Sequence, residues 1–270
     1  MEHSIETINE IHELKLPYGT PIKIKYTTKE FEYNLLVYNK RDRFENAVVL
    51  SNGAVDLNKK RPPIFMRSKW AKEIDASLIY LDDATLHGTE LKLGWGQGNK
   101  NEFVLKVYSK LVKAIISKIN LETDHVFYYG SSAGGFMSLI LAAMHNGSTA
   151  IVNNPQTDVK NYHEGHSRPL LEMSYGTIET AYNSFRERVN VVNAFKHVDN
   201  VPHIYYIQNQ YSFHDLKYHV NPFIKSMKED ELEIEKVTFI NYFDKERGHT
   251  PLDKDPALNS LNLLIKRNLF

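Results

Sequence analysis

The pattern of apolar and polar positions divides the chain into strands and helices that alternate along its length. Residues 22–26 and 31–38 alternate β-branched or aromatic residues with polar ones, as half-exposed antiparallel strands do. Residues 47–50 and 77–81 are uniformly apolar and stop at polar residues, which is typical of buried strands that run into loops. The pattern predicts a sheet that passes from an exposed N-terminal edge to a buried interior.

Helical and strand-like patterns follow each other from residue 100 onward. Apolar residues recur three and four positions apart between about 100 and 120, which predicts an amphipathic helix. Strands are expected at 126–129, 149–152, 203–207 and 237–240, and further helices at 136–144, 216–227 and 256–266. Repeated strand–helix units predict an α/β fold with a mostly parallel sheet covered by helices on both faces. We expect one domain, 1–270, with a cap-like insertion at about 156–198, where strand character is missing.

Composition and charge remove several classes of function. Lys and Arg total 33 and Asp and Glu total 33, so no overall positive field attracts nucleic acid. The absence of cysteine excludes disulfides, thiolate metal sites and a cysteine nucleophile. Residues 1–6 lack the pattern of a secretory signal, and no segment approaches the roughly 20 apolar residues of a membrane span. These features predict a cytoplasmic protein without a membrane span.

The pattern G-x-S-x-G occurs at residues 130–134, between a predicted strand and a predicted helix. This context is that of a nucleophile elbow, in which a tight turn leaves no room for side chains at the flanking glycines. Ser132 would then project at the N-terminus of a helix, whose amides favour developing negative charge. A glycine-rich turn used only for packing is the alternative interpretation.

A serine nucleophile needs a histidine base and an acid that orients it, in the chain order Ser, acid, His for this fold. Asp215 follows the strand ending near 207, and His249 follows the strand ending near 240. We therefore expect Ser132, Asp215 and His249 to be catalytic. Three other aspartates near predicted strand ends remain alternatives for the acid: Asp83, Asp158 and Asp244.

The oxyanion hole is expected to combine two backbone amides. One belongs to Ala133, the residue after the nucleophile, and the other to the loop after 47–50, at Asn52 or Gly53. An ordinary Asn-Gly turn is an equally good interpretation of that dipeptide. His163 and His166 do not have the H-E-x-x-H spacing and lack an evident third ligand, so no metal site is expected.

Four segments carry a family resemblance: 51–54, 63–70, 93–95 and 129–136. From about residue 22 to its end, the chain resembles the α/β-hydrolase superfamily. These segments look like bacterial proteins of capsular or cell-surface polysaccharide biosynthesis, some of which are similar to serine-dependent O-acetyltransferases. That group commonly has Asp-Pro where this chain has Asp83-Ala84.

The resemblance implies that Ser132 takes an acetyl group from a donor such as acetyl-CoA and that His249 activates a sugar hydroxyl. No bound cofactor is implied, and the partner is a carbohydrate or a small ester. Candidate substrate-binding residues are Trp95, Arg67, His166 and Arg168. Two alternatives stay open: a carboxylesterase that hydrolyses a small ester, and a non-catalytic module that binds a glycan or a protein partner. The intact order of Ser132, Asp215 and His249 argues against the second.

Overall fold

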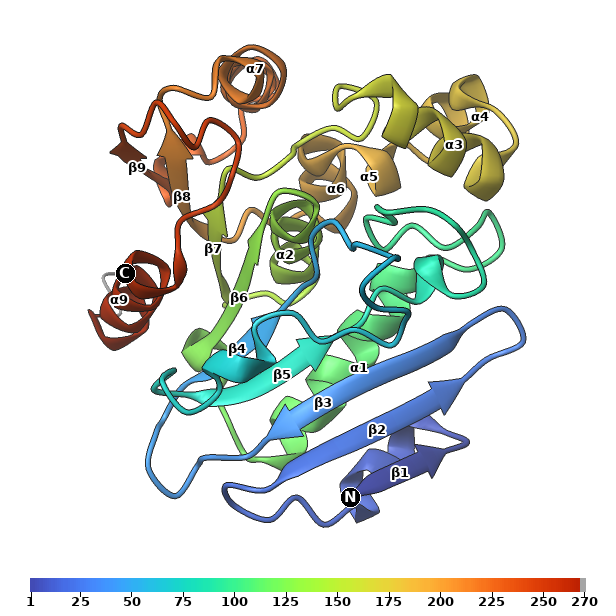
Figure 1. The fold of residues 1–270 in the computed structure, drawn as a ribbon, viewed down its shortest axis with the longest axis vertical. Helices are drawn as coiled ribbons and strands as arrows, with labels where there is room; N and C mark the ends of the chain where they lie inside the picture. The colour runs from blue at the N-terminus through green and yellow to red at the C-terminus, as the bar shows by residue number, and fades with distance from the viewer. Residues whose placement is uncertain (268–270) are drawn as a thin grey trace.

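A single mixed sheet forms the centre of the molecule (Figure 1). The computed structural model describes residues 1–267. Within them the sheet has nine strands in the order β1-β2-β3-β5-β4-β6-β7-β8-β9. The strands are β1 (Glu2–Ile5), β2 (Pro21–Thr27), β3 (Glu32–Tyr38), β4 (Ala47–Leu50), β5 (Ser77–Leu81), β6 (Val126–Ser131), β7 (Thr149–Asn153), β8 (His203–Asn209) and β9 (Val237–Tyr242).

Strand direction follows the prediction. β2 pairs with β3, and β3 with β5, in the antiparallel sense, whereas β4 through β9 are joined by parallel pairs. The predicted antiparallel N-terminal strands and mostly parallel sheet are therefore confirmed. β1, which pairs with β2 in parallel, was not predicted, because only Ile5 of its four residues is buried and its pattern is too short to stand out.

Alternate residues of the central strands face two separate apolar clusters. In β4, Val49 belongs to the larger cluster, which includes α1 (Val104–Lys118), α2 (Ala133–Ala143) and α6 (Val191–Val198). Val48 and Leu50 belong to a second cluster, which α9 (Lys254–Arg267) covers with one apolar stripe. Figure 1 shows α9, in red, on the opposite side of the sheet from α2 and α6. Helices thus cover both faces, as predicted.

The expected insertion at 156–198 contains α3 (Glu164–Tyr175), α4 (Ile178–Ser184), α5 (Arg186–Val189) and α6. α6 contacts α2 and α8 (Asn221–Glu229), so it is part of the layer that covers the sheet. α3 and α4 contact each other and lie at the end of the molecule toward which the arrowhead of β6 points (Figure 1). A short helix α7 (Phe213–Asp215) and a π-helical turn (Leu216–Val220) precede α8. No helix within residues 1–267 is both long and apolar enough to cross a membrane.

Candidate active site

A sharp turn joins β6 to α2 at Ser132. Its backbone has φ 54° and ψ −123°, a strained conformation for a residue with a side chain. A Cβ at Gly130 would overlap the carbonyl group of Gly134, and a Cβ at Gly134 would lie 2.8 Å from the carbonyl oxygen of Ser51. The flanking glycines are therefore required by close backbone approach, and the turn has the geometry of a nucleophile elbow.

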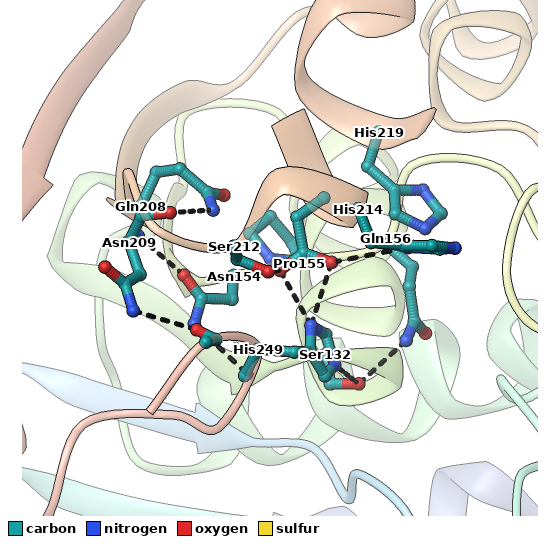
Figure 2. A network of polar contacts seen from close by, with 12 residues as sticks. Ser132, Asn154, Pro155, Gln156, Gln208, Asn209, Ser212, His214, His219 and His249 are labelled. Carbon is teal, nitrogen blue, oxygen red and sulfur yellow. Dashed lines mark hydrogen bonds and ion pairs between the residues drawn. The ribbon is translucent and has the colours of Figure 1, made fainter. Parts of the chain in front are cut away.

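Three side chains form a hydrogen-bonded chain that starts at this turn (Figure 2). The Oγ of Ser132 lies 2.9 Å from Nε2 of His249, and Nδ1 of His249 lies 2.7 Å and 2.9 Å from the two oxygens of Asp215. When Nδ1–H donates to Asp215, Nε2 is left free to accept the serine proton. The structure brings together the serine, histidine and aspartate that the sequence singled out.

Asp215 is held in its ionised form. Its side chain is 1% exposed, and burial alone would raise the pKa of this carboxyl. The hydrogen bond to His249, the charge of that imidazole and the Ser212 hydroxyl, 2.6 Å from Oδ2, outweigh burial and lower the pKa of Asp215 below its ordinary value. A buried negative charge beside Nδ1 favours the imidazolium that forms when His249 takes a proton.

The alternative acids are engaged elsewhere in the fold. Asp83 accepts a hydrogen bond from the Gly96 N–H, Asp158 from the Tyr182 hydroxyl, and Asp244 from the Arg247 N–H. None of the hydrogen bonds found within residues 1–267 joins these three carboxylates to His249. Asp215 is thus the acid that orients the histidine.

Asparagine side chains at the ends of β7 and β8 hold the loop that carries His249. Asn154 donates to the carbonyl oxygen of His249 at 3.1 Å, and Asn209 donates to that of Gly248 at 2.9 Å. Asn153 accepts the N–H of Leu252 at 2.8 Å. The sequence analysis did not single out these residues, although the polar pair that follows a buried apolar strand at 153–154 was a usable signal.

Gln156 was also not predicted from the sequence. Its Nε2 donates to Ser132 Oγ at 2.8 Å, from a side different from that of His249 (Figure 2). Its Oε1 accepts the indole N–H of Trp95 at 2.6 Å, and both side chains are fully buried. Trp95, predicted to contact substrate, instead lies behind Gln156 and orients its amide.

The two expected oxyanion donors differ in their surroundings. Ala133 is the first residue of α2, and N–H groups in the first helical turn have no acceptor within the helix. The Gly53 N–H donates to the sulfur of Met66 at 3.3 Å. The Asn52 side chain is engaged, because it donates to the Ile64 carbonyl at 2.6 Å and accepts the Met66 N–H at 3.0 Å. A thioether is a weak acceptor, so a substrate carbonyl oxygen can displace it from Gly53.

The sequence matches no protein-family model and no curated protein. Solved structures are similar over nearly the whole chain. The capsule O-acetyltransferase of Neisseria meningitidis serogroup A superposes with a TM-score of 0.63 at 14% identity, covering 90% of this chain and 92% of that one. The chain has the α/β-hydrolase fold.

Other α/β-hydrolase neighbours are also named as enzymes. Fluorophosphonate-binding serine hydrolase F of Staphylococcus aureus has a TM-score of 0.58 at 12% identity, over 94% of this chain and 100% of its own. S-formylglutathione hydrolase of Agrobacterium tumefaciens has a TM-score of 0.56 at 11% identity, over 94% and 95%. A mutant of the Neisseria enzyme, whose structure contains CoA, superposes with a TM-score of 0.61 at 13% identity, over 91% and 94%. The expected resemblance to α/β-hydrolases and a capsule O-acetyltransferase is confirmed at the level of fold.

The remaining substrate-binding candidates lie in different surroundings. Arg168 is exposed on α3 and forms ion pairs with Glu164 and Glu172, so its charge is already matched on that helix. The ring of His166 lies 6.0 Å from that of Tyr162, which is itself 5.8 Å from His249. Arg67 donates to the Ser131 hydroxyl at 2.6 Å, directly beside the nucleophile. Of these candidates, Arg67 is the one that contacts the elbow.

One group within residues 1–267 presents metal-ligand types close together. Ligand atoms of His214, Asp215 and His219 all lie within 4.8 Å of one another. Both oxygens of Asp215 are hydrogen-bonded to His249, and Nδ1 of His219 accepts the Thr157 N–H at 3.3 Å. The carboxylate of this group is therefore already engaged with His249. The pair His163 and His166 is not part of this group.

Proposed function

We propose that this protein is a serine acyl-transfer enzyme that O-acetylates a carbohydrate, with Ser132, His249 and Asp215 as its catalytic triad. The observation that carries the proposal is the continuous hydrogen-bonded chain from Ser132 Oγ through His249 to Asp215, built on a strained turn at the nucleophile. A turn used only for packing would need neither the positive φ at Ser132 nor a serine hydroxyl hydrogen-bonded to a histidine that is paired with a buried aspartate.

The first half-reaction forms an acyl-enzyme. Nε2 of His249 accepts the proton of Ser132 as Oγ attacks the acyl carbonyl carbon, and the N–H groups of Ala133 and Gly53 receive the carbonyl oxygen as it becomes negative. The tetrahedral intermediate collapses when the bond to the leaving group breaks, and His249 gives its proton to that group. For acetyl-CoA, the proposed donor, the leaving group is the CoA thiol.

The second half-reaction moves the acetyl group to the acceptor. His249 removes the proton of an acceptor hydroxyl, whose oxygen attacks the acetyl-Ser132 carbonyl, and the proton returns to Oγ as the ester bond breaks. The amide of Gln156, 2.8 Å from Oγ, fixes the serine rotamer that faces His249 and donates to the oxygen that leaves in this step. Support for a carbohydrate acceptor comes from the similarity in fold to a capsule O-acetyltransferase.

An esterase is the second candidate, and one observation favours it. The His249 side chain is 31% exposed, so water reaches the base that would otherwise activate an acceptor hydroxyl. The same acyl-enzyme serves both reactions, and only the attacking group differs. The third possibility, a binding module without catalysis, is disfavoured by a fully assembled triad.

The test is the mass of the intact protein after incubation with acetyl-CoA and, separately, with p-nitrophenyl acetate. We expect wild type to gain one acetyl group, and Ser132→Ala to gain none. Accumulation from acetyl-CoA that disappears when a glycan acceptor is added would support the transferase, and turnover of the aryl ester alone would support the esterase. Folded protein that gains no acetyl group and releases no nitrophenol would refute both.

A further inference from the structure

A pocket of about 590 Å³ lies between the loop after β4 and the segment after His249. Its lining includes Lys59, Lys60, Met66, Arg67, Lys69 and Leu252. Met66 contacts the Gly53 N–H, and Arg67 contacts Ser131, the residue before the nucleophile. A molecule bound in this pocket therefore lies against two side chains that contact the expected oxyanion donor and the elbow.

Arg67 is a cation without an acidic partner. None of the ion pairs formed within residues 1–267 includes it. Its guanidinium lies between the rings of Trp70 and Tyr129, 5.4 Å and 5.2 Å from their centres. Nη2 donates to Ser131, whereas Nη1 is buried and has no hydrogen-bond partner among residues 1–267. A buried donor on a charged group costs free energy when it stays unpaired, so this arrangement favours an anion.

The backbone of Arg67 supports the same interpretation. Its φ is 63°, in the left-handed region, where residues with side chains are uncommon. Strain of this kind persists where surrounding contacts enforce it, and it clusters at sites that bind ligands. Here the two aromatic rings and Ser131 fix the guanidinium in place before any ligand arrives.

The other charged residues of the pocket are mainly positive. Three lysines line it, and its one acidic residue, Asp56, is already paired with Lys59 at 3.2 Å. A carboxylate ligand would need one cation, whereas an arginine fork surrounded by several lysines suits a group with more than one negative charge. Phosphate has this charge and geometry.

We propose that this pocket binds a phosphate group of the substrate, with Arg67 as its anchor. The inference rests on the proposed function, since the phosphate belongs either to the acyl donor or to a phosphorylated acceptor. An anchored phosphate would hold the reacting group beside Gly53 and Ser132, and it would favour such substrates over neutral esters of similar size.

The experiment measures how fast a fluorophosphonate probe labels Ser132 in the presence of competitors that differ by their phosphates. The donor series is CoA, 4′-phosphopantetheine and pantetheine, of which the last two differ by a single phosphate, and the acceptor pair is glucosamine 1-phosphate with glucosamine. The proteins are wild type, Arg67→Met, which keeps an unbranched chain between the two rings, and Lys72→Gln, an exposed lysine of the same segment outside the pocket. The double variant Lys60→Gln/Lys69→Gln replaces Arg67→Met if that protein does not fold.

In wild type, we expect one phosphate-bearing competitor to protect Ser132 at a concentration about 10-fold or more below that of its neutral partner. Arg67→Met should remove most of this advantage, the double lysine variant should reduce it, and Lys72→Gln should keep it. Protection by CoA identifies the donor as the source of the phosphate, and protection by glucosamine 1-phosphate identifies the acceptor.

Equal protection by the members of the donor series and by those of the acceptor pair in wild type would overturn the proposal, and so would an advantage that survives in Arg67→Met and in the double variant. Failure of the proposed acyl-enzyme chemistry gives a different result, because Ser132 would then not be labelled at all, and an esterase would be labelled but would form no acetylated carbohydrate. Calorimetric titration of the same proteins with CoA and with glucosamine 1-phosphate would in that case test the pocket directly, with the same comparison across variants.

Discussion

The two sides of Ser132 are built in different ways. On the histidine side, made by the ends of β7 and β8 and the segments 212–220 and 244–252, side-chain hydrogen bonds hold the base and its acid: Asn153, Asn154 and Asn209 hold the loop, and Ser212 holds Asp215. On the oxyanion side, residues 51–70, the Gly53 N–H meets only a thioether and one nitrogen of Arg67 has no partner.

This difference separates two requirements of an acyl-transfer site. Proton transfer needs the base fixed within a few tenths of an ångström, so the loop that carries His249 and its partner Asp215 are held by several hydrogen bonds before substrate binds. Substrate binding needs donors that are free, so the oxyanion side keeps weak or missing contacts that a ligand replaces. Five changes test this contrast.

Ser132→Ala removes Oγ, the atom that lies between the histidine side and the oxyanion side. We expect turnover of p-nitrophenyl acetate to fall by about 10⁴-fold or more, with the urea midpoint of unfolding nearly unchanged, because the side chain is small and its loss leaves the elbow in place. Steady-state kinetics and urea titration measure the two effects. Retention of turnover would disprove the triad.

Asp215→Asn replaces the buried carboxylate of the histidine side with a neutral amide. The amide keeps the shape of the carboxylate but can donate to Nδ1, which leaves His249 with its proton on the wrong nitrogen. We expect kcat to fall by about 10⁴-fold at neutral pH. Asp244→Asn, near the same loop but bonded to Arg247, is the matched control and should stay within a few-fold of wild type.

Gln156→Leu tests the buried amide between Trp95 and the nucleophile. It removes the donor to Oγ and the acceptor of the indole N–H, so the serine rotamer is no longer fixed. A loss of about 10- to 100-fold in kcat is expected, with a smaller change in KM. Wild-type kcat in a folded Gln156→Leu protein would show that the contact is only structural.

His219→Asn tests how the burial of His219 makes the free energy of unfolding depend on pH. Burial lowers the pKa of His219 to about 3, so as pH falls below about 6.5 the unfolded chain takes a proton that the folded protein does not. Stability therefore decreases as pH decreases, and this residue should account for about 2 kcal/mol between pH 7 and pH 5. Urea unfolding at pH 7 and at pH 5 measures this loss of unfolding free energy, which should be about 2 kcal/mol smaller in the variant than in wild type. Asparagine is chosen because its amide oxygen can replace Nδ1 as the acceptor of the Thr157 N–H.

His145 contributes to the same slope, since burial lowers its pKa to about 4. The His219→Asn variant should therefore lose only part of the pH dependence, and His145→Asn should lose another part. If the slope were the same in all three proteins, neither histidine would be neutral in the folded state.

Met66→Leu makes the smallest change, on the oxyanion side. It removes the sulfur that accepts the Gly53 N–H while keeping the bulk of the side chain. Because substrate is expected to displace this weak contact, kcat/KM for p-nitrophenyl acetate should change by less than about threefold. Asn52→Ala, which removes both hydrogen bonds to the segment 64–66, should lower kcat/KM more than Met66→Leu does. If the two variants lowered kcat/KM equally, the Met66 side chain would be needed to hold the loop in place.

The sequence was enough to predict the parts of the site that local patterns encode. A tight turn between strand and helix needs glycines at fixed positions, and triad members follow strand ends in a known order, so the three hydrogen-bonded residues of the proposed triad, Ser132, Asp215 and His249, could be named from the sequence. The strands β4 and β5 were predicted to the residue, because uniformly apolar runs bounded by polar residues have few other structures.

Contacts that depend on packing between distant segments could not be predicted in this way. Gln156 meets Ser132 across 24 positions and Trp95 across 61, and neither spacing has a local signature. The burial of Trp95 was missed for the same reason. β1 has a single buried residue, so its strand structure comes from pairing with β2 rather than from its own pattern.

The position of α9 has a consequence for how the chain folds during synthesis. The apolar stripe of this helix packs into the cluster on one face of β4, β5, β6, β7 and β8, which residues 71–76 also join, and the Asn46 side chain donates to the Ile265 carbonyl across 219 positions. The part of that face that α9 covers stays exposed until the helix has left the ribosome, although the strands beneath it emerge much earlier. Such a nascent chain carries an apolar surface for most of its synthesis, which makes it a substrate for the chaperones that bind ribosome-attached chains.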